Sequence, residues 1–157
     1  MTEPVTPQDE VLAFSLEPGR LVTLKVLGHH TGDNVMLFEE VTPPGTATPL
    51  HVHHESDEVM YVLAGAFVCK VDDDITPVAP GGCVFIPRGA PHAWKNVGSE
   101  PGRVLFVYAP AKAGTVFEAL AKNGGKPPVD DAEIMDWLRQ HDAEVVGAEP
   151  FSGVLGA

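Results

Sequence analysis

A chain of 157 residues, 44% of them hydrophobic, has the length and the apolar content of one globular domain. Its formal net charge of −12 argues against binding to nucleic acid or to an anionic membrane, because both would repel the protein. The N-terminus lacks the basic and apolar segments of a secretory signal, and no apolar run approaches the ~20 residues of a membrane span. We therefore expect a cytoplasmic protein that binds neither nucleic acid nor membrane.

Short apolar segments, separated by glycine and proline, dominate the chain up to residue 110. Several alternate between apolar and polar positions, which is typical of strands with one buried face. The expected strands are Val11–Leu16, Leu21–Leu27, Val35–Val41, Leu50–His53, Glu58–Leu63, Phe67–Val71, Ile75–Val78, Cys83–Ile86, His92–Val97 and Arg103–Tyr108. Such a series predicts an all-β sandwich or barrel. Cys69 and Cys83 fall within these strands, so we expect both in the core.

Helical patterns replace the strands in the last third of the chain. Thr115 and Glu118 have the spacing of a capping box, which predicts a helix over residues 115–122. Asp130–Glu133 predicts the start of a second helix, and Gly147 its end. The apolar stripe of this second helix is formed by Ile134, Trp137, Leu138 and Val145. We expect a helical tail over about residues 114–147, packed on a β core of about residues 20–110.

Two histidines, His51 and His53, are separated by one residue in an expected strand. Residues i and i+2 of a strand point to the same face, so both imidazoles can face one space. A tight turn at residues 54–57 would bring Glu58 onto the neighbouring strand. Two imidazoles and one carboxylate make most of a transition-metal site. His54 alternates to the opposite face and is expected at the surface.

These residues belong to the pattern G-x5-H-x-H-x4-E-x6-G, which runs from Gly45 to Gly65. Fifteen residues separate it from a second pattern, G-x5-P-x-G-x2-H-x3-N, which runs from Gly81 to Asn96. In this order the two patterns resemble the paired motifs of the cupin superfamily. The resemblance implies a single cupin domain over residues 1–157, built as a jelly-roll β-barrel with short C-terminal helices.

The resemblance also implies one divalent transition metal per chain, held by His51, His53, Glu58 and His92. Imidazole and carboxylate ligands suit Fe, Mn, Ni, Co, Cu or Zn, and the residues do not select among these metals. A divalent ion with one glutamate would carry a net charge of about +1. Such a site can bind an enolate or a phenolate and lower the pKa of the corresponding enol or phenol.

The pocket beside such a metal is expected to have apolar walls. Met60 and Val62 share the inward face of their strand with Glu58, and Trp94 shares a face with the second-motif histidine. The candidate substrate-pocket residues are Phe38, Met60, Val62, Phe85, Trp94 and Phe106. Few cations fall near the two motifs, so a phosphorylated sugar is not the favoured substrate.

Among cupins, the first motif and the helical tail most resemble small bacterial proteins related to quercetin 2,3-dioxygenase. By that resemblance, dioxygen would cleave a ring of a flavonol or a similar enolisable aromatic compound, with Glu58 as both ligand and catalytic proton acceptor. One alternative is a non-oxidative enzyme of the same Lewis acidity, such as a polyketide cyclase or an isomerase. Another is a metal-containing protein that binds a small molecule without turnover. Single-barrel cupins often pair through outer strands, so we also expect a homodimer.

Overall fold

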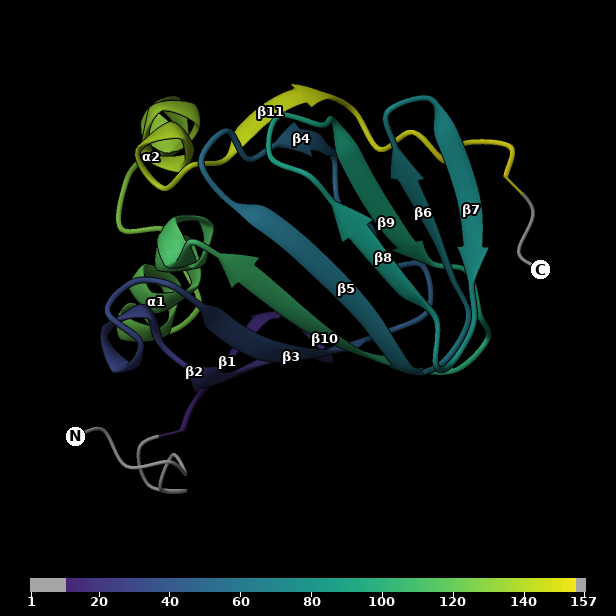
Figure 1. Ribbon diagram of the computed structural model, residues 1–157, viewed down its shortest axis with the longest axis horizontal. Coiled ribbons are helices and arrows are strands. Elements are labelled where there is room, and N and C mark those ends of the chain that lie inside the picture. Colours follow the sequence, from purple (N-terminus) through teal and green to yellow (C-terminus); the bar gives the residue numbers. More distant parts are fainter. Residues whose placement is uncertain (1–10, 155–157) are drawn as a thin grey trace.

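The computed structural model describes residues 11–154, which form two antiparallel β-sheets packed face to face with helices gathered at one end (Figure 1). The all-β jelly roll with short C-terminal helices that the sequence predicts is thereby confirmed. None of the helices in this described range has the length and the apolar character needed to cross a membrane.

The observed strands match the ten expected ones to within one residue at each end, and one strand is added. They are β1 (Leu12–Glu17), β2 (Arg20–Val26), β3 (Met36–Thr42), β4 (Leu50–Val52), β5 (Asp57–Ala64), β6 (Phe67–Val71), β7 (Asp74–Val78), β8 (Cys83–Ile86), β9 (His92–Asn96), β10 (Gly102–Ala109) and β11 (Glu144–Gly147). The α-helices are α1 (Thr115–Lys122) and α2 (Ile134–Gln140).

The central strand β10 sets the position of the core side chains. The six-stranded sheet has the order β1-β2-β3-β10-β5-β8, and the five-stranded sheet has the order β11-β4-β9-β6-β7. Burial alternates along β10, so Val104, Phe106 and Tyr108 all face inward. Phe106 lies opposite Phe38 of β3, and Tyr108 lies opposite Glu58 of β5. Because alternate residues of β10 face inward, this one strand contributes side chains both to the aromatic core and to the predicted site.

The second helix is shorter than the sequence predicts. It ends at Gln140, and the next residues form β11, which pairs antiparallel with β4 and places Val145 opposite His51. The chain turns at Asp142, whose φ of 58° lies in the left-handed region that ends helices. The helical assignment of Val145 was wrong because pairing with the edge of β4 satisfies this backbone, and helical periodicity carries no information about such a partner.

The other end of the tail also differs in detail. The expected capping box of the first helix is not formed, because Thr115 is the first residue inside α1 and Gly114 occupies the N-cap position. A 3-10 helix over Asp131–Glu133 leads directly into α2, and the backbone N–H of Asp130 donates to the Glu133 carboxylate at 3.3 Å, so the expected helix start is confirmed.

Strand β8 directs outward the two residues that were expected inside, Cys83 and Phe85. Phe85 lies opposite Val59 and is 61% exposed, so its placement in the pocket was wrong. Cys83 is also exposed, whereas Cys69 is buried as expected. In a four-residue strand at the edge of a sheet, a short apolar run does not reveal which alternate residues point inward. The expected homodimer stays a prediction.

Gly102 provides a test of the packing at the start of β10. A Cβ at this position would lie 2.5 Å from Cζ of Phe67, a ring that is 1% exposed and has no room to move. We predict that Gly102→Ala lowers the free energy of unfolding by about 1–3 kcal/mol, the usual cost of overpacking. Urea denaturation would measure the loss.

The matched control is Gly147→Ala, where a Cβ would make ordinary 3.5 Å contacts with Leu50. That variant should stay within about 0.5 kcal/mol of the parent. Equal losses for the two variants would contradict the packing at Gly102.

Candidate metal centre

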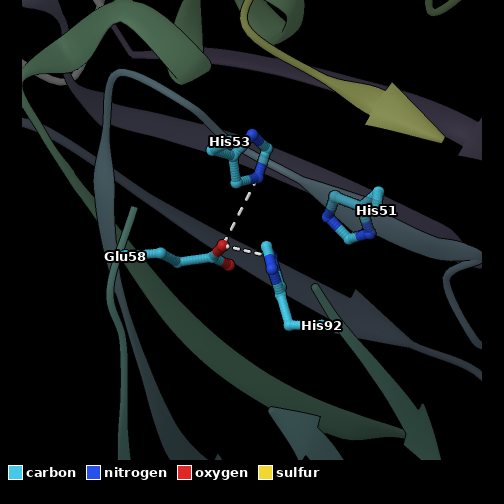
Figure 2. Close-up of side chains that lie close together, drawn as sticks. All are labelled: His51, His53, Glu58 and His92. Atoms are coloured by element: carbon cyan, nitrogen blue, oxygen red, sulfur yellow. Dashed lines mark ion pairs between the residues drawn. The ribbon is translucent and has the colours of Figure 1, made fainter. Parts of the chain in front are cut away.

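Four side chains from both sheets converge near the helical end of the molecule (Figure 2). His51 of β4 lies opposite His92 of β9, His53 directly follows β4, and Glu58 comes from β5 in the other sheet. One candidate ligand atom from each residue lies within 4.8 Å of all the others. The structure therefore brings together the four residues that the two sequence motifs single out.

The facing atoms of this cluster lack hydrogen-bond partners. Within the described chain, Nε2 of His53, Nε2 of His92 and Oε2 of Glu58 are buried and make no hydrogen bond, although they lie close to one another. The Oε2 atom lies 2.9 Å from Nε2 of His92 and 3.4 Å from Nε2 of His53. Buried polar atoms without partners are costly, and a cation among them would satisfy all three. The residues present thus fit a metal ion.

Backbone carbonyl groups fix the orientation of all three imidazole rings. The distances from Nδ1 to the carbonyl oxygen are 2.9 Å for His51–Pro49, 3.0 Å for His92–Ala90 and 2.7 Å for His53–Asp142. A carbonyl oxygen only accepts hydrogen bonds, so each Nδ1 donates and the lone pair of the neutral ring lies on Nε2. The three lone pairs therefore face the shared centre, as metal ligation requires.

Burial and neighbouring charges set the protonation states of the cluster. Burial would raise the pKa of Glu58, but in the metal-free cluster His92 and His53 outweigh that effect when they are protonated, and they hold this pKa well below its ordinary value. A metal ion would displace those protons and take the lone pairs on Nε2. Burial, together with His92 and His53, lowers the pKa of His51 to about 3. Near neutral pH the cluster therefore offers an ionised carboxylate and a neutral His51 ring, which are the forms that bind a divalent metal.

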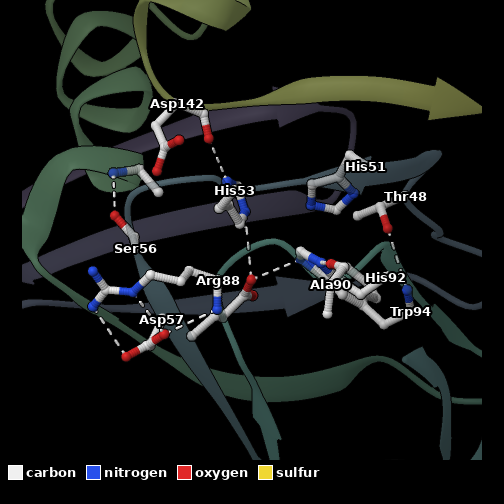
Figure 3. A network of polar contacts seen from close by, with 12 residues as sticks. Thr48, His51, His53, Ser56, Asp57, Arg88, Ala90, His92, Trp94 and Asp142 are labelled. Carbon is white, nitrogen blue, oxygen red and sulfur yellow. Dashed lines mark hydrogen bonds and ion pairs between the residues drawn. The ribbon is translucent and has the colours of Figure 1, made fainter. Parts of the chain in front are cut away.

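Asp142, at the turn between α2 and β11, anchors the segment that carries His53 (Figure 3). Its carbonyl oxygen accepts the His53 Nδ1–H, and its carboxylate accepts the backbone N–H groups of His54 and Glu55 at 2.7 and 3.0 Å. The residue is 5% exposed. Sequence reasoning missed Asp142 because 89 residues separate it from His53 and no motif links the two.

An apolar cavity of about 260 Å³ opens beside His51 and His53. Its polar lining also includes Arg20, Thr48 and Tyr108. Most of its apolar wall comes from α1, α2 and the following segment through Val116, Phe117, Leu120, Leu138, Ala143 and Val145. A second cavity of about 50 Å³ is lined by residues that include Glu58, and it shares Arg20, Thr48, His51, Tyr108 and Phe117 with the first.

The expected pocket residues divide into three groups. Phe38, Trp94 and Phe106 line the smaller cavity. Met60 and Val62 are fully buried in the core and line neither of the two cavities. Phe85 is exposed at the surface. Sequence reasoning missed the helical wall and Arg20, which lie outside both motifs. The alternating pattern of β10 would have indicated that Tyr108 faces inward together with Phe106.

A family model described as a cupin domain matches residues 38–108, the segment that contains all four converging side chains. This chain carries a cupin domain. The residues that form the helical wall of the cavity, and Asp142 with them, lie beyond the matched segment.

Curated relatives of this cupin include two Streptomyces proteins. Protein SchB of Streptomyces halstedii is 36% identical over 70 residues, which cover 45% of this chain and 51% of SchB. The tetracenomycin polyketide synthase protein TcmJ of Streptomyces glaucescens is 31% identical over 67 residues, which cover 43% of this chain and 45% of TcmJ. The chain thus spans about half the length of each. An uncharacterised Methanocaldococcus jannaschii protein is 29% identical over 103 residues, 64% of this chain and 81% of that protein.

Solved structures share the fold of this cupin. KdgF from a Halomonas species superposes with a TM-score of 0.60 at 19% identity, covering 69% of this chain and 94% of KdgF. A cupin-superfamily sugar phosphate isomerase from Silicibacter pomeroyi has a TM-score of 0.55 at 25% identity, covering 68% of this chain and 75% of that protein. These likenesses support the jelly-roll architecture of the chain.

Metal binding should depend on the buried histidines and not on the exposed one. We predict uptake of about one divalent ion per chain, measured by elemental analysis after reconstitution. His92→Ala removes a buried ligand atom and should abolish this uptake at micromolar metal. His54→Ala is the matched control, because this exposed ring contacts Glu144 and lies outside the cluster. Full uptake by His92→Ala would rule out the site.

Asp142 should influence metal affinity although it supplies no side-chain ligand. Asp142→Ala removes the carboxylate that holds the two backbone N–H groups and frees the carbonyl that orients His53. Loss of such orienting groups usually weakens metal binding by ~10- to 100-fold, which calorimetric titration with Zn²⁺ would measure. Asp142→Asn keeps an oxygen acceptor and tolerance of the left-handed backbone, so it should lose less. An unchanged affinity in Asp142→Ala would contradict the positioning role.

Proposed function

We propose that this cupin is a metal-dependent enzyme that removes a proton from an enolisable, ring-containing small molecule of polyketide type and promotes its non-oxidative cyclisation or isomerisation. The observation that carries the proposal is the placement of a buried, ionised Glu58 among three inward-facing imidazole nitrogens beside an apolar cavity. The likeness to TcmJ, a polyketide synthase protein, supports the substrate class.

A divalent ion held by His51, His53, Glu58 and His92 would supply Lewis acidity that lowers the pKa of an enol or phenol. Glu58 would act as the proton acceptor. Its Oε2 atom contacts the two buried histidines, and its side chain also lines the smaller cavity. One carboxylate can thus serve both the histidine cluster and the substrate.

Tyr108 is suited to hold the substrate oxygen from the other side. The register of β5 and β10 places it opposite Glu58, and it lines both cavities. Burial raises the pKa of Tyr108 well above its ordinary value, and the nearby Glu58 and Glu40 act in the same direction. The phenol therefore stays protonated near neutral pH and donates a hydrogen bond. The apolar helical wall would exclude water from an ionised intermediate.

Oxygen-dependent ring cleavage of a flavonol-like aromatic compound is the second candidate. The apolar lining of the cavity favours it, because the lining would shelter a carbanion-like substrate from water and admit dioxygen. A third possibility is a metal-containing protein that binds such a molecule without turnover. All three share the histidine cluster and differ in what happens to the bound molecule.

Product mass and oxygen uptake distinguish these functions. Metal-loaded protein would be incubated with quercetin and, separately, with an aromatic 1,3-diketone, in air and under anaerobic conditions. The proposed function predicts a diketone product of the same mass, or lighter by one water, formed equally in both atmospheres. Oxygen consumption with quercetin would favour the dioxygenase instead. Binding without any product would identify a binding protein.

The role of Glu58 in proton transfer can be separated from its role in metal binding. A glutamine oxygen can still coordinate a metal but cannot accept a proton as a carboxylate does. We predict that Glu58→Gln, compared at matched metal content, loses ~10²–10⁴ in single-turnover rate. Glu55→Gln is the control, since Glu55 is exposed two residues beyond His53. Near-normal turnover at full occupancy would place the base elsewhere.

A further inference from the structure

Arg20 brings a positive charge to the candidate site, and neither of the two sequence motifs contains it. It lies on β2, outside the matched cupin segment, and lines both cavities together with His51 and Tyr108. Its side chain is 15% exposed. It is the one lysine or arginine among the described residues that line these two cavities.

Two neighbours hold the guanidinium group in place. Glu40, which is 1% exposed, accepts from Arg20 Nε at 2.9 Å and from Nη2 at 3.3 Å. The ring of Trp94 lies below the guanidinium, 5.4 Å from Cζ to the ring centroid. The group is therefore fixed before any ligand arrives, as a preorganised binding residue must be.

The guanidinium retains hydrogen-bonding capacity for a ligand. Arginine has five N–H donors. Two donate to Glu40, and Nη1 lies 3.5 Å from the more exposed Glu17 carboxylate. No other protein acceptor within residues 11–154 takes the remaining N–H groups. A purely structural ion pair would not need to line both cavities.

The charges of the buried groups limit the charge of the ligand. Burial raises the pKa of Glu40, but the bidentate contact with Arg20 at 2.9 and 3.3 Å favours the carboxylate form, so the two charges cancel one another. A divalent ion with Glu58 would carry about +1. The site thus balances one negative charge. A monoanion fits this sum, whereas a phosphate dianion does not, so the arginine does not turn the pocket into a sugar-phosphate site.

We propose that Arg20 is an oxyanion-binding residue and that the substrate is a hydroxy-carbonyl or 1,3-dicarbonyl compound, which becomes a conjugated monoanion with two oxygens when it loses one proton. This rests on the proposed function. One oxygen lies at the histidine cluster and the other accepts hydrogen bonds from Arg20. When the proton passes to Glu58, the electron pair of the broken C–H or O–H bond spreads over both oxygens. Arg20 then stabilises the charge that reaches the second one.

Two phenols of similar size test the proposal without turnover. In 4-hydroxybenzaldehyde the phenolate charge spreads to a carbonyl oxygen across the ring, too far away for both oxygens to bind one metal. In 4-ethylphenol the second oxygen is missing. With affinities referred to the phenolate form, which corrects for the greater acidity of the aldehyde, Zn²⁺-loaded protein should bind the aldehyde ~10- to 100-fold more tightly, the usual effect of a hydrogen bond to a charged group. Calorimetry and the absorption band of the bound phenolate would measure both affinity and ionisation.

The informative variant is Arg20→Gln/Glu40→Gln, which removes both charges and leaves no uncompensated buried carboxylate. It should lose the preference for the aldehyde while keeping its affinity for Zn²⁺. Arg20→Lys, which keeps the charge but loses the planar fork, should lose part of the preference. If circular dichroism shows that the double variant does not fold, the aldehyde preference of Arg20→Lys decides whether Arg20 binds the second oxygen.

The outcomes separate this inference from the proposed function. Zn²⁺-dependent phenolate binding with an unchanged aldehyde preference in the folded variants would overturn the role of Arg20 alone. An Arg20-dependent preference that needs no metal would support the anion subsite and overturn the proposed function. Failure of the parent protein to bind either phenol as its phenolate would overturn both.

Discussion

The metal centre depends on a set of hydrogen bonds that the imidazole Nδ1–H groups donate to backbone carbonyl oxygens. Two of these carbonyls lie two residues before their own histidine, so the local backbone at Pro49 and Ala90 orients His51 and His92. The third carbonyl belongs to Asp142, far along the chain. With the tautomers fixed in this way, the rings can meet only through Nε2, and the cluster is specified before any ion arrives.

The contact at Asp142 also explains why the tail folds as it does. A helix running on to residue 147 would carry the Asp142 carbonyl away from His53 and leave the edge of β4 uncovered. Ending the helix at Gln140 allows β11 to pair with β4 and lets one left-handed residue contact three successive positions of the metal-binding segment, from His53 to Glu55. Tail and barrel therefore form one packed unit around the site.

Much of the fold and the ligand cluster was predictable from the sequence because the spacings involved are local. His51 and His53 follow the two-residue period of a strand, and the two motifs are characteristic enough to indicate the jelly roll. What the sequence did not show depended on pairing across long distances. The strand at Glu144–Gly147 needs β4 as a partner, and Phe85 points outward because of the register with β5. Arg20 enters the site only because β2 lies beside β3 in the same sheet.

The division of the cavity between barrel and tail has a consequence for how such a protein can diversify. The four candidate metal ligands lie within residues 38–108, whereas most of the apolar wall comes from residues 116–145. Replacements in the wall at Phe117 or Leu138 would reshape the space offered to a guest molecule and leave the histidine cluster intact. Two proteins with the same ligand residues and different tails could therefore accept different molecules, which makes the tail, more than the shared motifs, the part to compare when relatives are grouped by substrate.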